Sequence, residues 1–231
     1  MKRVLNTSKW LAAALTVVVL ASSIVTFAAN NSTFSQVINA GTLSTDILDS
    51  SRVAVGSPAV SMSASNFSFS CQTGGSASTG TFGTNNERVY VSNPDAADSG
   101  WNLTVAATGG VTTRWANGGA TQHFDFNDPT TSGCTDGGGD ADTSSGQLTL
   151  DPSVSTLTTD CVSCTSANVT KGSSTAYEQG VTDSVTLLSA AAGSDDVWRG
   201  YLTGIAASQT IPAETPVDTY TLNLTLTATA L

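Results

Sequence analysis

Hydrophobic and polar residues alternate strictly near the end of the chain, in the sequence VDTYTLNLTLTATAL between residues 217 and 231. Four large apolar side chains there are separated by single threonine or asparagine residues: Tyr220, Leu222, Leu224 and Leu226. A period of two is typical of a β-strand with one buried face and one solvent-exposed face. The same alternation occurs far upstream, where Trp-Asn-Leu-Thr-Val follows Gly100. The pattern therefore predicts a sheet protein whose paired strand signals come from distant parts of the chain.

Similar short alternations recur between clusters of glycine, asparagine and aspartate. They cover residues 34–48, 59–70, 88–92, 101–107, 123–126, 147–150, 183–189, 197–202 and 220–229. Glutamate, lysine and arginine, which form exposed helical faces, are rare, so we expect only one short helical turn, at residues 190–198. Several short strands separated by turns predict an all-β fold, an antiparallel β-sandwich of the Ig-like or jelly-roll-like kind.

Residues 128–183 differ in composition, because they are rich in Asp, Gly, Ser and Thr and contain three of the four cysteines. We interpret this section as a long loop insertion across one end of the sandwich, pinned by a disulfide rather than by a core. Its few large apolar residues do not predict a second domain. The prediction is a single β-sandwich domain over residues 29–231.

The first 28 residues have the layout of a secretory signal peptide. A basic start is followed by an uncharged apolar stretch over residues 11–25 and by small residues near Ala28. The alternative is an uncleaved membrane anchor over residues 10–29. A cleaved leader predicts a secreted or cell-surface protein that meets the membrane only during export.

Without the three basic residues of the leader, five basic residues face 18 acidic ones, so the net charge is −13. Such a chain repels nucleic acid phosphates and anionic lipid headgroups, which excludes nucleic acid as a partner. The four cysteines, Cys71, Cys134, Cys161 and Cys164, suit an oxidising compartment, and all three pairings remain open. Zinc or redox chemistry at the C-V-S-C pair is the alternative to structural disulfides.

Two groups of polar side chains are candidates for metal binding. His123, Asp125 and Asn127 share one face of an expected strand, which we interpret as a solvated outer face. Asp140, Asp142 and Ser144 follow the spacing of a calcium loop, but Gly146 comes one position late and the flanking helices of an EF-hand are not expected. A calcium-stabilised surface loop remains a hypothesis, with four carboxylates: Asp136, Asp140, Asp142 and Asp151. We expect no other cofactor.

Nothing in the sequence indicates catalysis. No G-x-S-x-G turn is present to expose a nucleophilic serine. A glycan hydrolase would need two carboxylates facing each other across a cleft, and the sequence pairs none. We therefore expect a protein that is not an enzyme.

The two alternating segments resemble the paired signatures of the bacterial WxL family of surface proteins. Trp101 and Leu103 match the upstream Trp-x-Leu strand, and three residues match the C-terminal strand: Tyr220, Leu224 and Thr225. Leu226 stands where the family has a second tryptophan. The resemblance implies an exported domain that attaches noncovalently to peptidoglycan or associates with other surface proteins through these strands.

The segment TFAANNSTFSQVINAGTLSTDIL, residues 26–48, is similar to the start of TasA and camelysin-like fibre proteins. The matching residues are Phe34, Ala40, Gly41, Thr42 and Leu43. This resemblance implies self-association, in which the N-terminal strand of one molecule completes the sheet of a neighbour. Our first hypothesis is noncovalent attachment to the bacterial cell wall or envelope; the alternative is a fibre or pilus subunit joined by donor-strand exchange.

Overall fold

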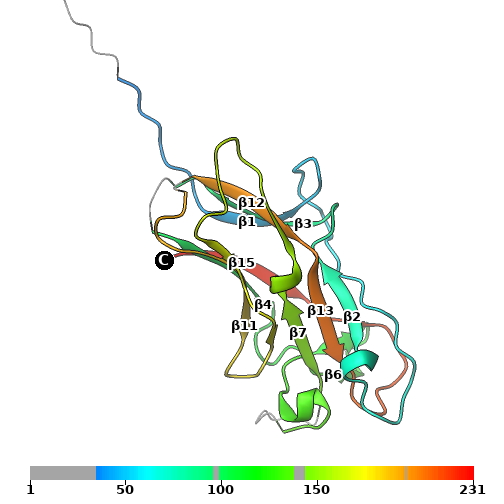
Figure 1. Ribbon diagram of the computed structural model, residues 1–231. Coiled ribbons are helices and arrows are strands. Elements are labelled where there is room, and N and C mark those ends of the chain that lie inside the picture. Colours follow the sequence, from blue (N-terminus) through cyan, green and yellow to red (C-terminus); the bar gives the residue numbers. More distant parts are fainter. Residues whose placement is uncertain (1–34, 96–98, 138–143, 196) are drawn as a thin grey trace, which may run out of the picture. The chain divides into compact units, whose positions relative to one another are not determined.

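The computed structural model describes residues 35–95, 99–137, 144–195 and 197–231 (Figure 1). The chain divides into two units, residues 1–39 and residues 40–231. In the first unit, the described residues 35–39 have no regular structure. The expected leader lies outside the described residues, and the described part of the chain contains no helix long and apolar enough to cross a membrane.

The second unit is all-β, as predicted, with antiparallel strands in four small sheets. The first sheet has the order β1 (Ser44–Leu48), β3 (Arg88–Asn93), β12 (Trp198–Thr203) and β8 (Thr156–Thr159). The second has the order β10 (Thr175–Ala176), β7 (Gln147–Asp151), β13 (Ile205–Thr210) and β2 (Ser78–Phe82). The third has the order β15 (Leu224–Ala230), β4 (Trp101–Ala107), β11 (Ser184–Ala190) and β9 (Val169–Lys171).

The fourth sheet is small, with the order β14 (Tyr220–Thr221), β5 (Trp115–Asn117) and β6 (His123–Phe124). Three short 3-10 helices complete the described elements: η1 (Gly74–Ser76), η2 (Thr130–Gly133) and η3 (Pro152–Val154). The predicted helical turn at 190–198 is wrong for its described residues, which form the end of β11, a turn and the start of β12.

Two layers of sheet enclose one hydrophobic core. The first and second sheets share continuous chain, because β12 leads into β13 through Gly204, whose φ of +81° is readily adopted by glycine. The third sheet packs against them, and the Trp101 ring of β4 lies 5.2 Å from the Trp198 ring of β12. Both indoles are 1% exposed. Burial of such large apolar side chains is the main stabilising contribution in a sandwich.

The two alternating segments of the sequence are neighbours in the third sheet. Strand β15 pairs antiparallel with β4, with Leu226 opposite Val105, Ala228 opposite Leu103 and Ala230 opposite Trp101. Along β4, every second side chain is buried. Alternation therefore identified two strands that lie side by side although more than a hundred residues separate them.

The predicted loop insertion at 128–183 is wrong for most of its length. It contains β7, β8, β9 and β10, and Leu148, Leu150 and Tyr177 contribute to the core. Strand β7 follows the alternation predicted at 147–150, whereas β8, β9 and β10 are only two to four residues long and too short to show one. Among the described residues of this section, the stretch before β7 contains no strand.

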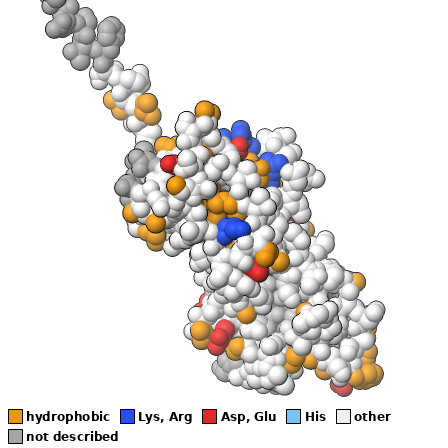
Figure 2. All heavy atoms as spheres, viewed as in Figure 1, with side chains coloured by type: hydrophobic (Ala, Val, Ile, Leu, Met, Phe, Trp, Pro, Cys, Tyr) orange, Lys and Arg blue, Asp and Glu red, His pale blue; other side chains and the backbone are white. Residues whose placement is uncertain are grey.

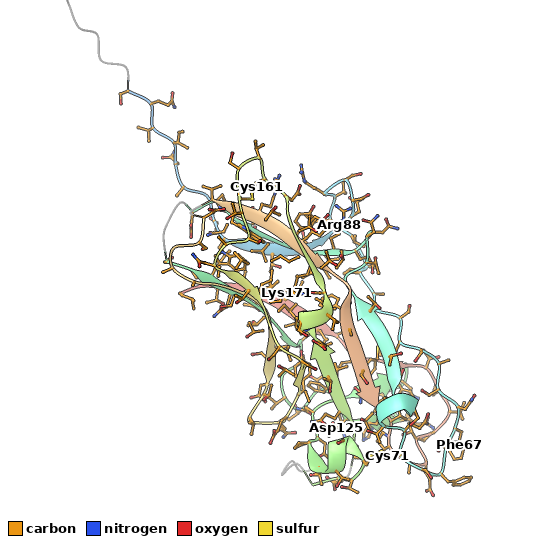
Figure 3. The ribbon with its side chains drawn as sticks, in the orientation of Figure 1. Phe67, Cys71, Arg88, Asp125, Cys161 and Lys171 are labelled. Atoms are coloured by element: carbon orange, nitrogen blue, oxygen red, sulfur yellow. A yellow bond between two sulfur atoms is a disulfide. The ribbon has the colours of Figure 1, made fainter. Side chains whose placement is uncertain are left out.

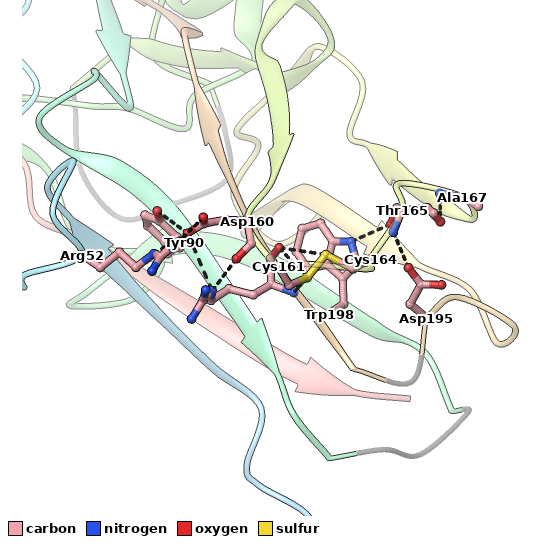
Figure 4. The surroundings of a disulfide bond; sticks show 10 residues. Arg52, Tyr90, Asp160, Cys161, Cys164, Thr165, Ala167, Asp195 and Trp198 are labelled. Carbon is pink, nitrogen blue, oxygen red and sulfur yellow. Dashed lines mark hydrogen bonds and ion pairs between the residues drawn. A yellow bond between two sulfur atoms is a disulfide. The ribbon is translucent and has the colours of Figure 1, made fainter.

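Two disulfides form, Cys71–Cys134 and Cys161–Cys164. The first pins the loop before β7, as expected for that part of the section. The second closes a turn between β8 and β9 (Figure 4). Structural disulfides are thereby supported, and both cysteines of the C-V-S-C pair are used.

Candidate functional site

An apolar cleft of about 510 Å³ opens the flank of the sandwich between the strands β1 and β15. Its floor is the core itself, with Val105, Leu148 and Leu150 at 1–3% exposure. Its two walls carry half-buried apolar side chains. We call it the β15 cleft; the wall residues are Ile47, Met62 and Phe82 on one side and Leu222, Leu224 and Leu226 on the other.

Strand β15 lies at the edge of the third sheet. Strand β15 has β4 on one side, and no described strand pairs with its other side. Strand β1 heads the first sheet and lies next to β15 without a hydrogen-bonded ladder between them. Edge strands usually carry charges or proline that prevent further pairing, yet residues 220–231 contain neither. The cleft is therefore bordered by an edge that can accept another strand.

A second cavity, of about 600 Å³, adjoins the cleft and shares Met62, Trp115 and Tyr220 with it. It lies between residues 62–72 and residues 211–220, and we call it the aromatic groove. The Trp115 indole donates through Nε1 to Gln209 Oε1 at 2.8 Å, and Phe124 stacks on it with ring centroids 5.9 Å apart. Sequence reasoning missed Trp115, because a three-residue strand is too short to show alternation.

The residues that match the WxL signatures have two different environments. Trp101 and Leu103 are 1% and 0% exposed and belong to the core, so they offer no surface to a ligand. Tyr220, Leu224 and Leu226 line the β15 cleft. Thr225 points outward, and its hydroxyl lies 2.7 Å from that of Thr108.

Of the strand expected at residues 34–48, only Ser44–Leu48 forms a strand, β1, and the use of the preceding segment as a donor strand stays a prediction. Phe34 lies outside the described residues. Gly41 donates its N–H to the Pro94 carbonyl at 2.8 Å, and Leu43 packs against the core of its own domain. Gly41 and Leu43 thus contact their own domain, so the candidate donor arm is the segment before Ala40. Val37 and Ile38 are 73% and 89% exposed.

The interpretation of Asp125 and Asn127 as a solvated face is wrong. Both are at least 98% buried, while His123 is exposed. The segment runs beneath the loop before β7, since Asp125 N–H donates to the Ser145 carbonyl at 2.8 Å. Within this segment the Oδ1 atom of Asn127 and the Oδ2 atom of Asp128 are buried without a hydrogen-bond partner. Figure 3 shows Asp125 close to Cys71 in the picture, at the end of the sandwich where this loop lies.

The four carboxylates of the calcium hypothesis are not all described. Asp136 is exposed, and Asp140 and Asp142 lie outside the described residues. Asp151 caps η3, where its Oδ1 atom accepts the Ser153 N–H at 3.0 Å. Among the described histidine, cysteine and acidic residues, no group of three or more could hold a metal ion. Calcium at this loop stays a prediction.

A cluster of charged residues lies beside the C-V-S-C disulfide (Figure 4). Asp160 accepts from Arg52 Nε at 2.7 Å and from the Tyr90 hydroxyl at 2.9 Å. Hydrogen bonds from Arg52 are the main reason that the pKa of Asp160 is lowered. Together the side chains connect the turn after β1 to the end of β8, which is a structural role.

On the face shown in Figure 2, basic side chains occur in a few separate places and most of the surface is uncharged. The chain matches no family model, no curated protein and no solved structure.

Proposed function

We propose that this protein is an exported, non-catalytic subunit that assembles on the cell surface by strand addition. The observation that carries the proposal is the β15 cleft, which opens above the core between half-buried apolar side chains, beside an uncharged edge strand. An incoming extended segment would pair with the free edge of β15 and place apolar side chains on the core. Each fully buried Val, Ile or Phe contributes roughly 1.5–3 kcal/mol.

The N-terminal arm of a neighbouring copy is the occupant that the chain itself supplies. Alternate residues of an extended strand share one face, so in an added strand Phe34, Gln36 and Ile38 would share one face, and Ser35, Val37 and Asn39 the other. The first face suits an apolar cleft. The segment from Ala29 to Thr45 carries no charge, so the arm itself brings no charged side chain into the cleft, whose lining includes the carboxylates of Asp46 and Glu87.

Substitutions on both partners test the proposal, each with a control on the neighbouring position. Leu226→Lys places a charge in the cleft, whereas Thr227→Lys places it on the exposed face of the same strand. Ile38→Asp charges the apolar face of the arm, and Asn39→Asp charges the opposite face. Electron microscopy of the protein lacking its leader is expected to show filaments for the parent and both controls and none for Leu226→Lys and Ile38→Asp.

Thermal unfolding of Leu226→Lys separates a blocked cleft from an unfolded domain. Ile38 is exposed, so Ile38→Asp leaves the domain intact. Filaments of unchanged length in both charged variants would contradict strand addition.

Attachment to the cell wall or envelope is the second candidate, because the aromatic groove beside the cleft supplies a further surface without basic side chains in its described lining. Retention of the monomeric Ile38→Asp variant on purified cell walls would support it. If the variant loses both filaments and retention on cell walls, retention depends on assembly and the domain has no wall-binding activity of its own.

A further inference from the structure

The aromatic groove is formed by two loops that backbone hydrogen bonds hold at a fixed separation. Gln72 and Ile211 exchange bonds at 2.9 and 3.1 Å, and Glu214 N–H donates to the Ser68 carbonyl at 2.8 Å. The cavity of about 600 Å³ is in the range of small-molecule binding sites. A groove held by main-chain bonds is preformed, so a ligand does not have to order it.

The groove presents aromatic rings whose positions are fixed by hydrogen bonds and stacking. Gln209 is 2% exposed and orients the Trp115 indole, while its own amide donates to the Asp125 carbonyl at 3.0 Å. The Tyr220 hydroxyl donates to the Pro216 carbonyl at 2.7 Å, and its ring lies edge-on to Phe124 at 5.0 Å. Phe67, labelled at the lower right of Figure 3, belongs to the lining and is 48% exposed.

Apart from Asp218, the polar side chains of the groove are neutral amides, hydroxyls and the Trp115 indole. The Asn66 side-chain amide makes no hydrogen bond to the described residues, and Gln72 uses only its Nε2 atom, toward the Asn66 carbonyl at 3.0 Å. Free amides both donate and accept. Asp218 is the one described charged residue of the lining, and its oxygens already accept from Asn117 at 2.8 Å and from the Thr219 N–H at 2.7 Å.

The aromatic rings and neutral amides of the groove favour some classes of ligand over others. No lysine or arginine belongs to the described lining, and the excess of acidic residues disfavours anionic polymers such as uronic acid chains. Flat aromatic faces pack against the C–H surfaces of a ring, and amides bind hydroxyl groups. We propose that the aromatic groove binds a neutral oligosaccharide, with Phe67, Trp115 and Tyr220 beside the sugar rings and Asn66 and Gln72 on the hydroxyls.

Calorimetry with defined hexasaccharides tests this site independently of assembly, in the monomeric Ile38→Asp background. The probes are β-1,4-linked hexamers of glucose and of N-acetylglucosamine, an anionic hexamer of galacturonic acid, and a proline-rich peptide. At least one neutral hexamer is expected to bind, and its binding is expected to quench tryptophan fluorescence. Phe67→Ala is expected to weaken binding by about fivefold to tenfold, as loss of an aromatic contact does.

Asn66→Ala tests the polar contribution and is expected to weaken binding by about fivefold. Val162→Ala, on the fully exposed turn of the second disulfide, is the control and leaves affinity unchanged. Absence of binding to both neutral hexamers would overturn the proposal. So would tighter binding of the anionic hexamer or the peptide, or equal affinity in Phe67→Ala and the parent.

Discussion

The two disulfides are expected to contribute very different amounts to stability, because they close loops of very different length. Cys71 and Cys134 are 63 residues apart, and the enclosed chain includes β2, β3, β4, β5 and β6, which belong to all four sheets. Cys161 and Cys164 are 3 residues apart and enclose no strand. The chain-entropy relation for cross-links gives about 4.3 kcal/mol for the first and about 1.6 kcal/mol for the second.

The comparison uses two double variants, Cys71→Ala with Cys134→Ala, and Cys161→Ala with Cys164→Ala. All four cysteines are half-buried, so lost packing is similar and the difference of about 2.7 kcal/mol reflects loop length. Urea unfolding measures the free energies, and the melting temperatures should differ by roughly 5–11 °C in a domain of this size. Equal losses, or a larger loss for the second pair, would refute the reasoning.

Three further predictions concern the fold. Asp160→Asn should make the free energy of unfolding depend less on pH in the acidic range. Because its pKa is lowered in the native state, Asp160 stabilises the fold above its unfolded pKa of about 3.9 and loses this effect as pH falls through the native pKa. In urea titrations, parent and variant should therefore differ by less than about 1 kcal/mol at neutral pH and converge at low pH. Tyr177→Phe should cost about 1 kcal/mol by removing the bond to the Val105 carbonyl at 2.9 Å. Burial raises the pKa of Tyr177, so in ultraviolet titration of the parent this phenol should ionise only on unfolding at high pH, and a tyrosine signal unchanged in the variant would contradict that. Gly172→Ala should destabilise the domain by about 1–3 kcal/mol, because a Cβ there would overlap the Thr186 carbonyl oxygen; Gly75→Ala, with open space around it, is the control in thermal unfolding.

Sequence alternation predicted the strands with strong contrast between large apolar and polar residues. The segments predicted at 101–107 and 183–189 correspond to β4 and to β11 (Ser184–Ala190). The expected pairing of the C-terminal strand with the strand that begins at Trp101 is confirmed as β15 and β4. Alternation missed β13, because Ile-Ala-Ala-Ser-Gln-Thr offers mostly small side chains with little contrast. It assigned a strand to residues 59–70, which in the structure run as coil, with Met62 beside Gly80 of β2.

The two cavities could not be predicted in this way. They depend on which edges remain uncovered and on loops that bring Phe67, Trp115 and Tyr220 together from distant positions. Burial of Asp125 and Asn127 was missed for a similar reason. The loop that covers them, around Ser145 and Gly146, lies some twenty residues further along the chain and is not part of the alternating segment. The family-like residues Tyr220, Leu224 and Leu226 were found because they belong to an alternating strand, although their position beside a cleft was not foreseen.

Strand addition at β15 is tested most directly by separating the arm from the domain. A peptide of residues 29–39 is titrated into the protein that begins at Ala40, and hydrogen exchange of the β15 amides is followed. The account predicts one-to-one binding that slows exchange along residues 224–230 and is lost with Ile38→Asp in the peptide. A peptide that does not bind, or that binds without protecting β15, would contradict it.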